Sequence, residues 1–93
     1  MAFVWASKDP DEVLDYNHDW SARLDGDTIV GPPQVIVEQG TVVVDSTSLG
    51  AGDVQTVWLS GGTGGEDVRL TLRVETTGGR TYDEGIKLKV KER

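Results

Sequence analysis

The chain has 93 residues, which suffices for one domain with one hydrophobic core. It contains no cysteine, which excludes disulfides, thiolate metal sites and a cysteine nucleophile. Sixteen acidic and nine basic residues give a formal net charge of -7, so the long-range field repels phosphate backbones and anionic headgroups. We therefore expect neither nucleic acid nor a membrane as a partner.

Residues 1–12 are an N-terminal arm or a first strand, and the sequence leaves both alternatives open. Phe3 and Trp5 lie in this segment with little local apolar sequence to bury them. Aromatic side chains are favoured anchors at interfaces, which makes Phe3 and Trp5 candidate interaction residues. Alternatively, both rings complete the core of the domain, because a strand so close to the terminus must be tied down. The segment lacks the basic start and the apolar stretch of a signal peptide.

Residues 13–93 are expected to form a single domain, in which apolar residues recur with a period of 2 and never with the helical period of 3.6. The alternation from Leu14 to Leu24 predicts one long strand, which Asp25-Gly26-Asp27 ends. A short strand from Thr28 to Val30 is predicted to stop before Gly31-Pro32-Pro33, because adjacent prolines cannot serve a central ladder.

The middle of the chain alternates between extended and turn-forming sequence. Gln34 to Glu38 and Thr41 to Asp45 are predicted to be extended, and Ser46 to Asp53 is predicted to be a polar loop. Gln55 to Ser60 is predicted to be a strand that carries Trp58. Ser60 to Glu66 lacks the lysine and the following helix of a phosphate-binding loop, so it is interpreted as a connection between strands.

The last third of the chain carries the clearest alternation. Val68 to Glu75 and Ile86 to Lys91 are predicted strands, and the latter places three lysines in water. Thr76 to Thr81 lies between them and contains paired glycines that suit a tight hairpin turn.

About seven short strands in this length predict an all-β fold, an Ig-like or fibronectin-like antiparallel β-sandwich. A partly open barrel is the main alternative. Large apolar side chains are expected to form the core, and loss of either core tryptophan is expected to destabilise it strongly. The expected core consists of Trp20, Leu24, Val57, Trp58, Leu59, Leu70, Leu72, Val74, Ile86 and Leu88.

No residue pattern indicates catalysis, a metal or another cofactor. His18 is the single histidine and lies in the row of Tyr16 and Trp20, so we interpret it as a structural strand residue. Asp25-Gly26-Asp27 fits a turn as well as a calcium loop, and it fits no EF-hand. We expect no enzyme activity.

Charge is unevenly distributed along the chain. Residues 1–30 hold seven acids and two bases, whereas residues 73–93 hold four acids and six bases. These counts give net charges of -5 and +2. The asymmetry indicates either solvated faces that happen to differ or an axis for ordered assembly.

Four blocks of the sequence are distinctive: Lys8-Asp9-Pro10, Asp15-Tyr16, Asp19-Trp20-Ser21-Ala22 and Trp58-Leu59-Ser60-Gly61-Gly62. With them, the chain resembles the phage fiber-tail adaptors, small structural proteins of tailed phages and prophages. The resemblance extends over nearly the whole chain, with His18 as a departure from the family pattern, in which an apolar residue is more usual.

The resemblance implies a structural virion-assembly adaptor without enzyme activity. Its partners would be other virion proteins of the tail, fibre or connector, and homo-oligomers in the particle are compatible with it. It would be made in the bacterial cytoplasm and then built into the virion. The alternatives are a head-tail connector or capsid-decoration subunit and, from another class, a carbohydrate-binding or calcium-dependent adhesive module that uses exposed tryptophans.

Overall fold

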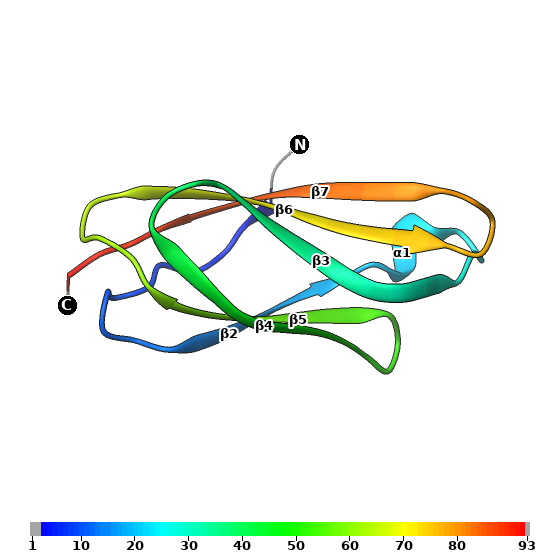
Figure 1. The fold of residues 1–93 in the computed structure, drawn as a ribbon, viewed down its shortest axis with the longest axis horizontal. Coiled ribbons are helices and arrows are strands. Elements are labelled where there is room, and N and C mark those ends of the chain that lie inside the picture. The colour runs from blue at the N-terminus through cyan, green and yellow to red at the C-terminus, as the bar shows by residue number, and fades with distance from the viewer. Residues whose placement is uncertain (1–2, 93) are drawn as a thin grey trace.

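A computed structural model describes residues 3–92 and shows two sheets packed face to face (Figure 1). Seven strands and one short helix make up the fold. They are β1 (Phe3–Val4), β2 (Leu14–Asp19), α1 (Ser21–Leu24), β3 (Ile29–Gln39), β4 (Val42–Gly50), β5 (Val54–Gly61), β6 (Asp67–Thr76) and β7 (Thr81–Lys89).

The strand order is that of an immunoglobulin-type sandwich. One sheet has the order β1-β7-β6-β3 and the other the order β2-β5-β4. Strands β2, β5 and β4 therefore correspond to B, E and D of a constant-type domain, and β7, β6 and β3 correspond to G, F and C. The first strand lies beside β7 and is parallel to it, whereas the other pairs are antiparallel. The predicted all-β sandwich is confirmed.

The core forms where the inward side chains of the two sheets meet. Alternate residues of β5, β6 and β7 are buried, together with Trp20 and Leu24, and nine of the ten expected core residues lie there. Trp58 is the exception, with 41% of its surface exposed. Its neighbours Val57 and Leu59 are fully buried, and because successive side chains of a strand point to opposite faces, Trp58 must point outward.

The predicted strand from Leu14 to Leu24 is wrong in its second half. Strand β2 ends at Asp19, whose carboxylate accepts a hydrogen bond of 2.9 Å from the Ser21 amide, and one helical turn follows. This local side-chain hydrogen bond competes with the sheet ladder and favours the turn. Trp20 and Leu24 are nevertheless both buried, because residues four apart also share one face of a helix.

Two further strand boundaries differ from expectation. Strand β3 continues through Pro32 and Pro33 with an irregular register between Val30 and Gln34, which is possible because β3 is an edge strand. Strand β4 extends to Gly50, so most of the predicted polar loop is strand. Hydroxyl side chains of this part of β4 form hydrogen bonds with the neighbouring strand β5. For example, Thr47 Oγ1 donates to the Thr56 carbonyl at 2.9 Å.

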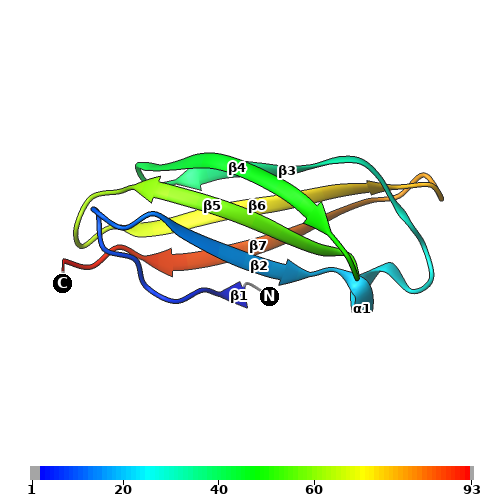
Figure 2. The same cartoon turned by 90° about the horizontal axis from the view of Figure 1, so that it is seen from below.

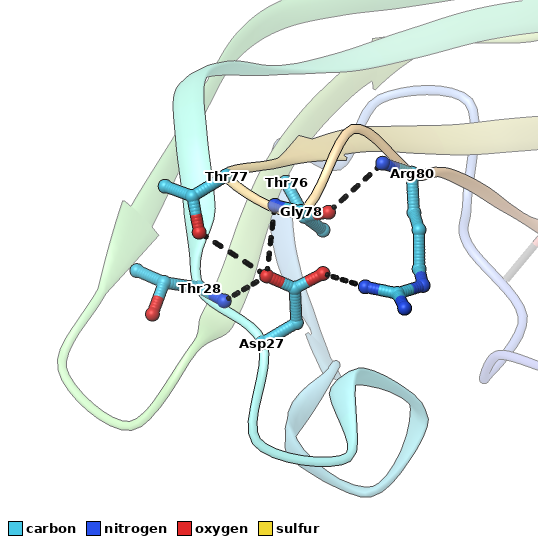
Figure 3. Close-up of polar contacts among 6 residues, drawn as sticks. All are labelled: Asp27, Thr28, Thr76, Thr77, Gly78 and Arg80. Atoms are coloured by element: carbon cyan, nitrogen blue, oxygen red, sulfur yellow. Dashed lines mark hydrogen bonds and ion pairs between the residues drawn. The ribbon is translucent and has the colours of Figure 1, made fainter.

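The carboxylate of Asp27 joins the predicted hairpin turn to the loop before β3 (Figure 3). Its Oδ1 accepts hydrogen bonds from the amides of Thr28 at 2.8 Å and Gly78 at 3.2 Å, and from the Thr77 hydroxyl at 3.2 Å. Its Oδ2 lies 2.9 Å from Nη1 of Arg80. Asp27, the last residue of the predicted turn Asp25-Gly26-Asp27, therefore ties two loops together at one end of the sandwich.

This cluster predicts an acid-dependent contribution to stability. Hydrogen bonds from a threonine hydroxyl of the turn and from the Thr28 amide, followed by those from Arg80 and Gly78, hold the pKa of the Asp27 carboxyl far below its usual range. A depressed folded-state pKa stabilises above the unfolded value of about 3.9, and that stabilisation is lost as pH falls toward the folded value. We expect Asp27→Asn to lower the melting temperature at about pH 7, and the gap to narrow steadily below about pH 4. Thermal melts of both proteins across this pH range measure the difference. A difference in melting temperature that stays constant with pH would contradict the stabilising role of the ionised Asp27 carboxylate.

Candidate interaction surfaces

The N-terminal segment runs along the edge of β7 as a first strand. Phe3 and Val4 pair in parallel with Ile86 and Lys87. The Trp5 amide then donates to the Lys87 carbonyl at 2.8 Å, which continues the pairing beyond β1. Of residues 1–12, Phe3 and Val4 form a strand, and Lys8 forms a separate bridge with Val90, whereas residues 1 and 2 lie outside the described part.

Lys8 fastens this segment to the other sheet. The residue is fully buried, and its Nζ donates to the Asp9 carbonyl at 2.9 Å and to the Gly61 carbonyl at the end of β5 at 2.7 Å. Its main chain pairs with the C-terminal segment, where the Lys91 amide donates to the Lys8 carbonyl at 2.8 Å. The residue types alone did not indicate this role for Lys8; the only signal was its place in one of the blocks that resemble the adaptors.

The two candidate aromatic residues differ in what they contact. Trp5 is partly buried against the core, and its ring stacks on Tyr16 with centroids 4.7 Å apart. The Tyr16 hydroxyl donates to the Ala6 carbonyl at 2.9 Å, which holds the segment in place. Phe3 meets the His18 ring edge to face at 4.8 Å but keeps half of its surface exposed. Trp5 therefore packs in the domain, whereas Phe3 and the 77% exposed Val4 face solvent.

His18 lies in an aromatic row between Phe3 and Trp20. Its ring is buried and meets the Trp20 ring edge to face at 4.8 Å. Burial lowers the pKa of the imidazole, and the carboxylates of Glu84 and Asp19 oppose that shift. The structural interpretation of His18 as a buried strand residue fits this position.

A second apolar surface lies on the outer face of the three-stranded sheet. Strands β2, β5 and β4 of this sheet are nearer to the viewer in Figure 2. Trp58 lies on the central strand β5, opposite Asp15 of β2 and Ser46 of β4. The adjacent Ser60 pairs with the exposed Val43 and donates a hydrogen bond of 3.0 Å to the Asp45 carboxylate. We call this surface, formed by Asp15, Val43, Asp45, Trp58 and Ser60, the Trp58 face.

Among residues 3–92, no three or more potential metal-ligating side chains gather in one place. The same residues contain no helix that is long and apolar enough to cross a membrane.

The fold and its surfaces define an Ig-like sandwich domain with exposed aromatic residues at a sheet edge and on a sheet face. The family described as podophage GP4 fiber-tail adaptor protein gp77 matches residues 8–89. No curated protein matches the chain. Because the match covers most of the chain, the protein belongs to this fiber-tail adaptor family, as its sequence blocks predicted.

Family membership makes the chain a structural phage protein that binds other virion proteins and becomes part of the virion. The matched residues begin at Lys8. They therefore include the buried lysine and the Trp58 face, whereas the candidate interaction residues Phe3 and Trp5 precede them.

Proposed function

We propose that the protein joins virion proteins without catalysing a reaction, and that its N-terminal strand β1 is a docking site for a tail or fibre partner. The main support for this proposal is that the N-terminal segment is held firmly in the fold and yet exposes apolar side chains. Trp5 and Lys8 hold the segment in the fold, whereas Phe3 and Val4 present apolar surface to solvent.

An ordered edge strand is well suited to accept a partner strand. Strand β1 is the last strand of its sheet, with β7 on one side and no described strand on the other. Extended partners add to such an edge through main-chain hydrogen bonds, and side-chain pockets provide specificity. Because β1 is already ordered, a partner does not bear the entropic cost of ordering it.

The proposed lack of catalysis is supported by the surroundings of His18. Its ring packs against those of Phe3 and Trp20, which offer no nucleophile. The two carboxylates that act on it are engaged elsewhere, Glu84 in an ion pair with Arg23 and Asp19 in a hydrogen bond from the Ser21 amide. We also propose that the protein is made in the bacterial cytoplasm before it enters the particle. The family assignment favours the adaptor over a head-tail connector or decoration subunit.

The proposal is tested by substituting Phe3, since deleting the segment would also remove the Trp5 packing. We expect Phe3→Ala to keep a cooperative thermal melt but to reduce incorporation into particles at least about tenfold, as for an interface anchor. Val30→Ala is the matched control, because Val30 is about half exposed on the opposite edge strand β3. Quantitative immunoblots of purified particles measure the effect. Normal incorporation of Phe3→Ala would refute docking at β1.

A further inference from the structure

One row of side chains crosses the outer face of the four-stranded sheet and brings two cations together. In this row Gln39 pairs with Arg69, Arg69 with Lys87, and Lys87 with Val4. Like charges directly opposite each other on neighbouring strands destabilise a sheet. Neither Arg69 nor Lys87 takes part in the four ion pairs formed within residues 3–92. The arrangement is favourable once an anionic partner lies over it.

The same row lies in a groove of about 550 Å³. The groove is lined by Val4, Trp5, Arg69, Lys87, Lys89 and Lys91, among others, and Lys89 is already paired with Asp67 at 3.7 Å. This volume lies within the range of ligand-binding clefts, so the groove can admit a large side chain. We call this surface the basic groove. It is a cationic, partly apolar site on a chain of net charge -7.

The Trp58 face has the complementary chemistry on the other side of the molecule. It combines the exposed apolar side chains of Trp58 and Val43 with the carboxylates of Asp15 and Asp45. The basic groove belongs to the outer surface of one sheet and the Trp58 face to the outer surface of the other. One molecule therefore cannot bring its own two surfaces together, but two molecules can.

We propose that the Trp58 face of one copy docks into the basic groove of a second copy. The indole would enter the groove beside Val4 and Trp5, while Asp15 and Asp45 would offset the unpaired charges of Arg69 and Lys87. Charge complementarity steers such an encounter, and a central tryptophan is the residue type most often found to dominate binding. The proposed adaptor role supplies only the biological setting of this contact, the phage particle. The contact itself is a property of the isolated chain, so it does not depend on that role.

The proposed contact joins two different surfaces and is therefore heterologous. Each copy in a pair keeps one unused groove and one unused face, so that further copies can add. Such contacts produce a ring if the rotation between copies closes, and an open filament if it does not.

Sedimentation velocity of the isolated chain tests the contact. We expect self-association that strengthens with concentration at about 50 mM salt and weakens at about 1 M salt, where the Debye length falls to about 3 Å. A groove variant, Arg69→Gln with Lys87→Gln, and a face variant, Trp58→Ser with Asp15→Asn, should each bind themselves at least about thirtyfold more weakly. The control Val30→Asp with Ala51→Asp changes the net charge by the same amount as the groove variant, and it should associate like the wild type.

Mixing the two variants provides the decisive measurement. The groove variant retains its Trp58 face and the face variant retains its groove, so the equimolar mixture should form a dimer that does not grow. A wild-type chain that stays monomeric up to about 1 mM at low salt would overturn the proposal and favour an acidic segment of another virion protein as occupant. The proposal would also be overturned if either variant alone associated as strongly as the wild type. It would equally be overturned if the wild type associated but the mixture of the two variants stayed monomeric. None of these results depends on particle incorporation through Phe3.

Discussion

Trp20→Ala is expected to destabilise the domain by about 3 to 5 kcal/mol, a large share of the stability of a protein this small. The indole is fully buried, and its Nε1 donates to Oε1 of Gln55 at 2.9 Å. Loss of the buried indole leaves a cavity. Because Gln55 is also fully buried, its side-chain oxygen loses a hydrogen bond that water cannot replace. We expect the melting temperature to fall by at least about 12 °C.

Trp58→Ala is the matched control for that measurement. The sequence prediction placed both tryptophans in the core, but Trp58 retains 41% of its surface on the outer face of β5. We expect a loss of about 1 kcal/mol or less, as for other substitutions outside the core. Chemical denaturation of both variants under the same conditions provides the comparison. Equal destabilisation by the two substitutions would contradict the outward orientation of Trp58.

Lys8→Met is expected to destabilise the domain by about 2 to 3 kcal/mol, although methionine has a similar length and is apolar. The buried ammonium group donates to two main-chain carbonyls, those of Asp9 and Gly61. Methionine fills much of the same space but donates nothing, so both carbonyls lose a charge-assisted hydrogen bond. The removal of a buried charge offsets part of this loss.

Lys91→Met is the control for Lys8→Met, because Lys91 is an exposed lysine on the neighbouring segment. Its substitution should change the free energy of unfolding by no more than about 0.5 kcal/mol. Urea denaturation measures both values. If the two variants were equally stable, the Lys8 hydrogen bonds would not fasten the N-terminal segment.

The sequence predicted the sandwich because its strands are half buried, and a half-buried strand has a period of 2. Val68 to Glu75 illustrates this, since its apolar residues face the core and its charged residues face water. The same rule places Trp58 outside once Val57 and Leu59 are assigned to the core. Assigning all three to the core gave too much weight to hydrophobicity and too little to alternation.

The features that the sequence did not reveal depend on contacts between distant residues. Burial of Lys8 requires the Gly61 carbonyl, and the adjacent positions of Arg69 and Lys87 require the register of β6 with β7. Neither contact can be predicted from the sequence of the residues immediately around it. Pro32 and Pro33 misled for the same reason, because only the strand order shows that β3 is an edge strand that tolerates them.

The pairing of β1 with β7 has a consequence for the order in which the protein is built. During translation Phe3 and Val4 are made well before Ile86 and Lys87, to which they pair. Loop-closure entropy must be overcome before such a distant contact contributes, and β-proteins dominated by such contacts fold slowly. The N-terminal segment therefore stays unpaired on the ribosome until synthesis has passed residue 87. If the proposed docking strand β1 is ordered by its pairing with β7, nascent chains that have not reached β7 lack the ordered docking strand.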